Sequence, residues 1–257
     1  FCVRGMTRDG HDFAPDAIER GAVALVVERP LGLGVPEIQV PSVRAAMAPA
    51  AARFNGDPSA TLRVVGVTGT NGKTTTAFLV RELLEADGRQ TGLLGTVKSV
   101  IGGIEHEVVR TTPEAIDLQR DLKRMLDGGD AACAIEVSSH ALELGRADAI
   151  HFAAAIFTNL TQDHLDFHPT MGEYFAAKRR LFEPGRARTA IVNVDDRYGA
   201  KLAAELEQPV TFALDDDRAI YTARDVETTQ TGSRFTALTP DGETEITTPL
   251  RGRFNVY

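Results

Sequence analysis

The chain has 257 residues, of which 43% are hydrophobic and 25% charged, a composition typical of a soluble globular protein with one large or two smaller domains. Its formal net charge of −8 offers no basic surface for nucleic acid, and no apolar run approaches the ~18 residues of a membrane helix, so we expect neither a nucleic-acid partner nor membrane insertion. Cys2 and Cys133 fit no metal-ligand spacing and stand in apolar segments. We therefore expect unpaired core cysteines in a reducing compartment, and a cytoplasmic protein.

The first part of the chain predicts a small α/β unit, because helical and strand patterns alternate there. Pro49 lies inside one of the helical patterns, and we expect that helix to be broken or kinked near it. The expected elements are helices over residues 12–21 and 43–56 and strands over residues 22–28 and 36–42.

A cluster of turn-forming residues at 55–60 separates two patterned regions and is the best candidate for a domain boundary. We expect residues 1–57 to form part of one domain and residues 58–257 to form a central domain.

From there on, strands and helices alternate in the way that builds a parallel sheet. Three of the strands are near-continuous apolar runs, which is typical of a sheet buried on both faces. The expected strands cover residues 62–69, 131–139, 152–160 and 189–195, and the expected helices cover residues 73–88, 115–129, 171–182 and 197–207.

Residues 233–248 change character, since polar and apolar residues alternate around a turn at Asp241 and Gly242. This pattern predicts an antiparallel hairpin. The predicted fold is thus a three-layer α/β domain with a mostly parallel sheet and an added antiparallel β element, preceded by the small α/β unit.

The stretch GVTGTNGKTTT, from Gly66 to Thr76, follows a predicted strand and opens a helix, which is the setting of a phosphate-binding P-loop. Val67 stands where the usual pattern has its first glycine, and a glycine appears at Gly69 instead. In such a loop Lys73 would reach the β- and γ-phosphates. A Gly-rich turn without a ligand is the alternative. ATP is favoured over GTP, because no asparagine in the chain precedes a lysine as base reading by a GTPase would require.

Two further segments place polar residues after apolar strands. Glu136 ends one strand, where open α/β sheets bind ligands, and it could either hold a metal or form a salt bridge. The segment FTNLTQDHLDFH ends another with Asp163, His164, Asp166 and His168, which predict either a metal ligand among the four or a solvated turn before a helix.

Six motifs occur in the order found in Mur ligases, and the chain resembles the MurE type of that family over essentially its whole length. EVSSHAL is the most discriminating of them, and the altered P-loop is the family's own. The six are GVTGTNGKTTT, RTTPEA, EVSSHALELGR, FTNLTQDHLDFH, YFAAKRRLF and LRGRFNV. Against the family pattern, Phe1 falls inside the N-terminal UDP-sugar-binding domain and Tyr257 just after the G-x-F-N element. We therefore expect a fragment without the C-terminal, amino-acid-binding domain.

The resemblance implies an ATP-dependent ligase of peptidoglycan precursor synthesis. The γ-phosphate of ATP would pass to a carboxylate of UDP-N-acetylmuramoyl-L-alanyl-D-glutamate, and the amine of a diamino acid would then attack the acyl phosphate. Mur-type enzymes of this kind need two Mg²⁺ ions to bring two anions together. We expect the protein to be a monomer. We also expect a span of this length to bind its ligands but to form little or no product.

The resemblance also implies roles for single residues. For ATP they are Gly69, Thr70, Asn71, Gly72, Lys73, Thr74 and Thr75, with Asn255 near the adenine. Thr74 and Glu136 would hold one Mg²⁺, and His164 would hold the second with Lys178 as a carbamate. Periodicity alone predicts Lys178 to be an exposed lysine on an amphipathic helix. The acceptor-binding positions are Thr111, Thr112, Ser138 and Arg146.

The sequence departs from the family pattern at two positions, and it leaves two alternative functions to consider. Arg110 stands where some members have asparagine and Leu144 where some have glutamine, which puts single acceptor contacts in doubt. A ligase of the same superfamily with a folate acceptor is one alternative, against which EVSSHAL argues. A nucleotide-binding module without catalysis is the other.

Overall fold

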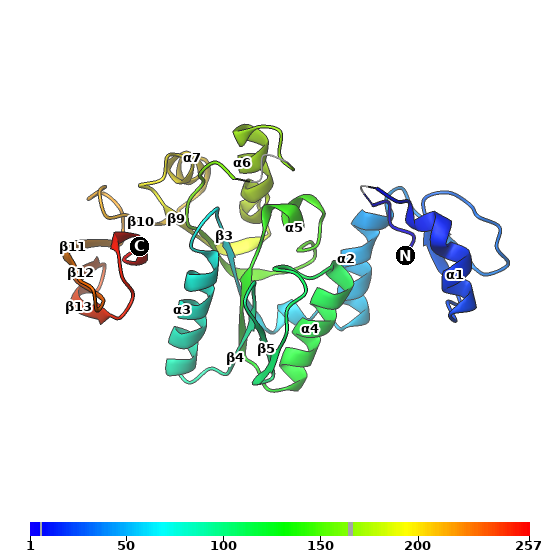
Figure 1. Ribbon diagram of the computed structural model, residues 1–257, viewed down its shortest axis with the longest axis horizontal. Coiled ribbons are helices and arrows are strands. Elements are labelled where there is room, and N and C mark those ends of the chain that lie inside the picture. Colours follow the sequence, from blue (N-terminus) through cyan, green and yellow to red (C-terminus); the bar gives the residue numbers. More distant parts are fainter. Residues whose placement is uncertain (6, 164–166) are drawn as a thin grey trace.

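A mostly parallel eight-stranded sheet forms the centre of the computed structural model, which describes residues 1–5, 7–163 and 167–257 (Figure 1). Its strands lie in the order β10-β9-β8-β3-β7-β4-β5-β6, and those from β10 to β4 run parallel. The parallel strands are β3 (Arg63–Thr68), β4 (Thr91–Leu94), β7 (Ala132–Glu136), β8 (Phe152–Phe157), β9 (Ala187–Asn193) and β10 (Val210–Phe212), and the antiparallel edge is β5 (Ser99–Ile101) and β6 (Ile104–His106).

Helices cover both faces of this sheet, which confirms the three-layer α/β prediction. On one face Ala77 of α3 packs with Val67 and Ala134. On the other, side chains of α4, α5, α6 and α7 pack around Val64, Ile135 and Phe157. The helices are α3 (Lys73–Ala86), α4 (Ala115–Asp127), α5 (Ser139–Glu143), α6 (Met171–Arg179) and α7 (Arg197–Glu205).

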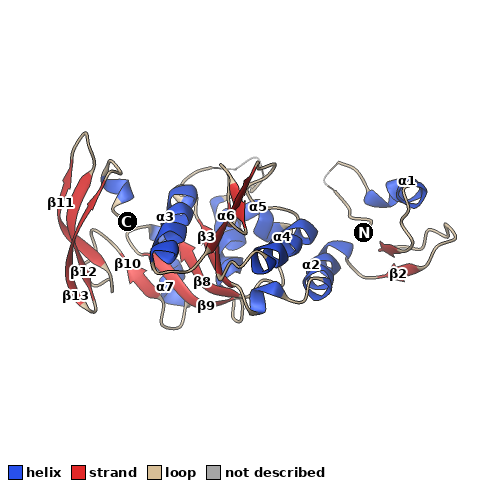
Figure 2. Ribbon diagram, turned by 90° about the horizontal axis from the view of Figure 1, so that it is seen from below, coloured by secondary structure: helices blue, strands red, loops and turns tan. Residues whose placement is uncertain are grey.

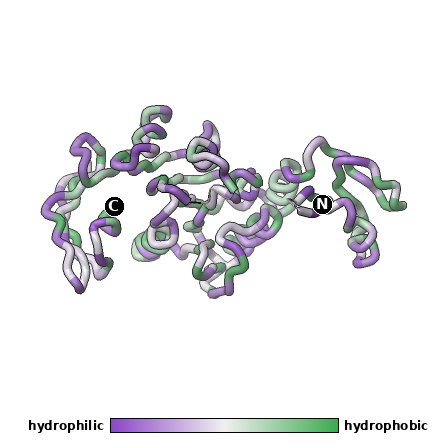
Figure 3. The backbone as a smooth tube through the Cα atoms, turned by 45° about the horizontal axis from the view of Figure 1, so that its top comes forward, coloured by the Kyte–Doolittle hydropathy of each residue, from purple (hydrophilic) through white to green (hydrophobic). Residues whose placement is uncertain are grey.

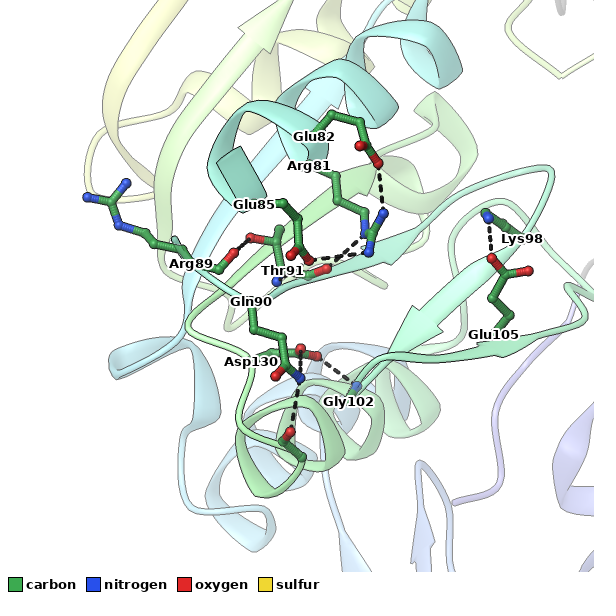
Figure 4. Close-up of polar contacts among 11 residues, drawn as sticks. Arg81, Glu82, Glu85, Arg89, Gln90, Thr91, Lys98, Gly102, Glu105 and Asp130 are labelled. Carbon is green, nitrogen blue, oxygen red and sulfur yellow. Dashed lines mark hydrogen bonds and ion pairs between the residues drawn. The ribbon is translucent and has the colours of Figure 1, made fainter. Parts of the chain in front are cut away.

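A polar network fixes the end of the sheet remote from the P-loop (Figure 4). The Asp130 carboxylate, just before β7, accepts hydrogen bonds from the Gly102 N–H and the Gln90 amide, both at 2.8 Å. From α3, the Arg81 guanidinium donates to the Thr91 carbonyl at 3.0 Å, and the Glu85 carboxylate accepts from the Thr91 N–H at 2.8 Å. Short strand β4 is thereby held beside β7, although its sequence gave no strand signal.

The N-terminal unit contains α1 (Ala14–Glu19), the parallel strands β1 (Leu25–Val27) and β2 (Glu37–Gln39), and α2 (Val43–Phe54) (Figure 1). Strand β1 is shorter than expected, since Val23 is 82% exposed. Of the two expectations at Pro49, a broken helix is wrong, since α2 continues through that residue, and a kink stays a prediction. Pro49 faces solvent, where water can bond the carbonyl that proline leaves free. Met47 and Ala48 of α2 pack against Ala115 at the start of α4.

A separate three-stranded antiparallel sheet lies at the opposite end of the molecule from α1 (Figure 2). Its strands are β11 (Thr222–Thr228), β12 (Ser233–Thr239) and β13 (Gly242–Thr248). The β12–β13 hairpin confirms the predicted hairpin, but its turn lies one residue earlier than expected, at Pro240 and Asp241, because Gly242 already pairs with Thr239. Strand β11 had not been predicted.

None of the described helices is long and apolar enough to cross a membrane. Along the tube in Figure 3, hydrophobic stretches are short and alternate with hydrophilic ones in every part of the chain.

Candidate nucleotide and acceptor cleft

The P-loop backbone depends on glycine at two positions. Gly69 has φ of +154°, and a Cβ there would lie 1.9 Å from the Thr158 hydroxyl oxygen. Gly72 precedes α3 in the left-handed region, at φ of +85°. Both conformations suit glycine, which has no Cβ to clash.

The segment after β8 holds this loop in place. The Thr158 hydroxyl donates to the Asn71 carbonyl at 2.6 Å, and the Asn159 side-chain oxygen accepts from the Asn71 N–H at 3.0 Å. The Thr70 hydroxyl donates to the Thr161 carbonyl at 3.2 Å and accepts from the Thr161 N–H at 3.0 Å. The TNLT part of the predicted metal segment therefore forms the outer wall of the P-loop.

The Lys73 side chain bonds to the backbone of the P-loop itself. Its ammonium donates to the carbonyl oxygens of Gly69 at 2.9 Å and Thr70 at 2.8 Å. Burial lowers the pKa of Lys73, while Glu136 and Asp163 oppose that shift by favouring the charged form.

Lys178 lies beside Lys73 in the interior. The side chain is 1% exposed, its ammonium donates to the Gly69 carbonyl at 2.7 Å, and it lies 4.6 Å from the centre of the Tyr174 ring. The interpretation from periodicity, an exposed lysine, is thus wrong, because α6 packs directly over the P-loop. Burial lowers the pKa of Lys178 well below its ordinary value, and the neighbouring charge of Lys73 lowers it further.

Glu136 is buried at the end of β7 and faces the start of α3. Its carboxylate accepts from the Thr74 hydroxyl at 3.0 Å, the Thr96 hydroxyl at 3.0 Å and the Thr96 N–H at 2.8 Å. A Cβ at Gly95 would lie 2.4 Å from this carboxylate, so the carboxylate needs glycine beside it. Thr74 and Glu136 together present hard oxygen atoms, the kind of ligand that Mg²⁺ prefers.

The predicted acceptor residues gather on the neighbouring segments. The Thr112 hydroxyl donates to the Glu136 carbonyl at 2.9 Å and accepts from the Ser138 N–H at 3.2 Å. Ser138 caps α5 by accepting from the Ala141 N–H at 3.1 Å. The hydroxyl oxygens of Thr111 and Thr96 lie 3.2 Å apart, within hydrogen-bond distance.

A cleft of about 450 Å³ connects the P-loop side with the acceptor side. Seven of the predicted residues line it, and they are Thr70, Lys73, Thr111, Thr112, Ser138, Arg146 and Lys178. Within the described ranges no three His, Cys, Asp or Glu side chains form a metal cluster, so a cation here would take its further ligands from bound phosphates or water.

Other predicted residues lie elsewhere. Asn255 is in the short 3₁₀ helix Arg253–Asn255, where its amide donates to the Arg251 carbonyl at 2.7 Å, and it is not among the described residues of the cleft. Thr75 is half-buried in the first turn of α3, and Asn71 is exposed. His164 and Asp166 lie outside the described residues. His168 is buried and stacks on Tyr174 at 5.1 Å between ring centres.

Asp163, one of the four candidates in its segment, lines the cleft. Sequence reasoning missed two polar residues of the site: Thr96, which binds Glu136, and Thr158, which supports the P-loop. Each acts through a partner more than 35 residues away in the chain, so no local spacing marks it.

The P-loop lies beside a carboxylate at the carboxyl edge of a parallel sheet. This arrangement defines a P-loop nucleotide-binding protein of the α/β class. Residues 67–257 match the Mur ligase middle domain, and the chain belongs to the Mur ligase family.

Several known ligases are similar to this chain in sequence or in fold. The UDP-N-acetylmuramoyl-L-alanyl-D-glutamate–2,6-diaminopimelate ligase of Geobacillus thermodenitrificans is 45% identical over 264 aligned residues, covering 100% of this chain and 54% of the relative. The chain therefore spans about half the length of the curated relatives that it matches. A solved structure of a ligase with the same name is 32% identical, with a TM-score of 0.84 over 96% of this chain and 52% of the other. MurF from Acinetobacter baumannii shares the fold, with 21% identity and a TM-score of 0.69 over 99% of this chain and 53% of the other.

Proposed function

We propose that this chain is the nucleotide- and acceptor-binding part of an ATP-dependent amide ligase of peptidoglycan precursor synthesis. Its acceptor would be UDP-N-acetylmuramoyl-L-alanyl-D-glutamate and its amine donor a diamino acid, as the names of the MurE relatives indicate. The observation that carries the proposal is the common cleft, in which Lys73 of the P-loop and Arg146 of the acceptor side line one cavity.

The chemistry requires two anions to meet. An oxygen of the acceptor carboxylate attacks the γ-phosphorus of ATP, the bond to the bridging β-γ oxygen breaks, and ADP leaves. The amine nitrogen then attacks the acyl carbon, and the bond from that carbon to the oxygen it shares with phosphorus breaks. Phosphate leaves with this oxygen, and the nitrogen loses a proton. Lys73 would leave its carbonyl partners for the phosphates and neutralise their charge there. Mg²⁺, when bound, would supply further positive charge between the phosphates and the acceptor.

The residues present fit a magnesium ion. Thr74 and Glu136 would hold one ion, because their oxygen atoms already lie 3.0 Å apart beside the P-loop. His164 and Lys178 would help to hold the second, a role that comes from the family resemblance. Asn255 near the adenine, with Thr75 and Asn71 at the phosphates, completes the ATP site that we propose.

Lys178 can act as a metal ligand only after a chemical change, since an ammonium repels a cation. We propose that its neutral amine attacks CO₂, which forms an N–C bond and releases one proton to solvent, leaving a carbamate with two oxygen donors. Its burial and its place beside Lys73 support this, because both favour the neutral amine. With ¹³C-labelled bicarbonate, NMR should show a carbamate signal that Lys178→Ala lacks, and a signal of equal size in both proteins would refute the assignment.

We further propose the division into residues 1–57, part of a UDP-sugar-binding domain, and residues 58–257, the ATP-binding domain. The packing of α2 on α4 would then join the two. The unpaired buried cysteines and the use of ATP support a cytoplasmic location, and we propose a monomer there.

A thermal-shift experiment tests the function. With a non-hydrolysable ATP analogue and Mg²⁺ present, UDP-N-acetylmuramoyl-L-alanyl-D-glutamate should raise the melting temperature and a folate should not. Lys73→Met should abolish the shift produced by the analogue. A folate shift would favour the related folate ligase instead, and a shift by the analogue alone would reduce the chain to a nucleotide-binding module.

A further inference from the structure

Arg146, one of the predicted acceptor residues, belongs to a cluster of charged side chains whose other members have no role among those given so far. The Glu114 carboxylate contacts the guanidinium groups of Arg146 at 2.8 Å, Arg110 at 3.0 Å and Arg44 at 3.7 Å. Arg110 and Arg146 line the cleft together with Lys73 and Lys178. These four residues, Glu114 with Arg44, Arg110 and Arg146, are called the guanidinium cluster below.

The position of Glu114 in the fold shows that its carboxylate is free for this task. Glu114 is the N-cap residue of α4, yet its side chain accepts no hydrogen bond from the helix backbone. Serine, threonine, aspartate or asparagine is usual at that position, because their short side chains reach the free N–H groups of the first turn. The longer glutamate instead turns to the arginines, which come from three different segments of the chain.

The cluster carries an excess of positive charge. Three guanidinium groups among the described residues share one carboxylate, which leaves a net charge of two within the cluster. The donors of Arg146 are not exhausted either, since its side chain is 14% exposed and its buried Nε has no hydrogen-bond partner in the part of the chain that the structure describes. Arginine offers five N–H donors in a planar fork that matches a carboxylate.

The proposed acceptor has a group that needs such a partner. Its terminal glutamate bears two carboxylates, and amide formation consumes only one of them. The other keeps its charge throughout the reaction and loses water when it enters the cleft, which is costly unless a cation receives it. Lys73 and the P-loop serve the reacting carboxylate, so the spectator carboxylate must be bound by a different set of cations.

We propose that the guanidinium cluster binds the spectator carboxylate of the acceptor, that Arg110 and Arg146 make the contact, and that Glu114 is the positioning residue that holds both toward the cleft. This inference rests on the proposed function. Arg110 occupies the place where some family members have asparagine, so it adds a positive charge at that place. Arg44 donates to the Leu144 carbonyl at 3.3 Å and thereby connects α2 to the segment that carries Arg146.

The test compares two ligands that differ by one charge. Isothermal titration would measure the affinity of the chain for UDP-N-acetylmuramoyl-L-alanyl-D-glutamate and for its D-isoglutamine counterpart, in which the spectator carboxylate is an amide. The wild-type chain should prefer the acid by about ten- to a hundredfold, the range for one hydrogen-bonded charge pair. In Arg110→Gln and in Glu114→Gln this preference should fall below about threefold, and Glu114→Asp should restore part of it.

Glu105→Gln is the matched control, because Glu105 pairs with Lys98 on the surface of the sheet edge and its substitution changes the net charge equally. It should keep the wild-type preference. A general loss of structure would weaken both ligands alike and leave their ratio unchanged, a result that refutes the positioning role. Arg110 is half-exposed, so its variant tests the inference even if Glu114→Gln folds poorly.

Three further outcomes are decisive. If Glu114→Gln binds the acid more tightly with an undiminished preference, Glu114 only repels the ligand and the inference is wrong. If neither ligand binds to the wild-type chain, the proposed function fails and the inference falls with it. Binding of both ligands with equal affinity overturns the inference while leaving the function intact.

Discussion

The P-loop edge of the main sheet and the β11–β13 sheet are both built from strands and turns, but their side chains are held very differently. At the P-loop edge, Glu136 and Lys178 are each 1% exposed and bond to segments far away in the chain. In the β11–β13 sheet, six of the seven β13 residues are exposed, and the side chains of β12 and β13 pair across neighbouring strands, as Arg234 does with Glu245.

This difference shows in which region each side chain depends on one particular partner. A buried polar group must have a partner, so each residue at the P-loop edge constrains another, and single substitutions should have large effects there. An exposed strand pair has water as an alternative partner, and its side chains can be exchanged at little cost. Matched substitutions in the two regions test this contrast.

The largest effect is expected for Gly69→Ala. The new Cβ would lie 1.9 Å from the Thr158 oxygen at a backbone φ of +154°, so steric overlap and backbone strain add. We expect a loss of about 3–5 kcal/mol in the free energy of unfolding, measured by urea denaturation, together with loss of nucleotide binding.

Gly21→Ala is the control for backbone strain alone. Gly21 has a φ of +97°, but a Cβ there would meet no atom within 4 Å. The expected cost is about 1–2 kcal/mol. Equal losses in the two variants would show that the contact with Thr158 does not constrain the loop.

The second effect concerns the metal rather than stability. Glu136→Gln keeps the shape of the side chain and removes its charge, so the affinity for the ATP analogue in Mg²⁺ should fall about ten- to a hundredfold. With EDTA present the two proteins should bind the analogue equally. A drop of the same size without Mg²⁺ would mean that Glu136 acts on the loop and not through a cation.

The sequence predicted the parts of the site that backbone geometry imposes. A P-loop needs Gly69, Gly72 and Lys73 at fixed spacing, and the alternation of apolar strands and helices sufficed for the three-layer fold. Thr96 and Glu114 gave no such signal, because each acquires its role only when the fold brings distant segments together.

Three of the missed strands, β4, β5 and β6, have a related cause. Strand β4 has four residues and β5 and β6 three each, too few to show a period, and contacts such as that of Asp130 with Gly102 define them. Lys178 illustrates the same limit: the helical pattern of α6 could not reveal that its polar residue faces the P-loop.

A smaller effect is expected for Thr158→Val, a nearly isosteric change. It removes the hydroxyl that donates to the Asn71 carbonyl at 2.6 Å, but the Asn159 amide still donates to that carbonyl at 3.1 Å. The free energy of unfolding should fall by about 1 kcal/mol. The matched change Thr244→Val, on an exposed position of β13, should leave stability unchanged or slightly raise it, because valine favours strands. Equal losses for the two threonines would remove the contrast between the regions.

The smallest effect is expected for Arg234→Gln in the β11–β13 sheet. Arg234 contacts Glu245 at 2.8 Å, but the two side chains are 59% and 62% exposed, so water and salt compete for both charges. The melting temperature should not change measurably, at low salt or at high salt. Glu245→Gln should behave in the same way, and the double variant should equal the sum of the two single ones. A clear loss of stability at low salt that disappears at high salt would show that this pair stabilises the sheet. Exposure alone would then be a poor guide to which polar contacts matter in this protein, and burial of the P-loop edge could no longer be taken as the reason for its sensitivity.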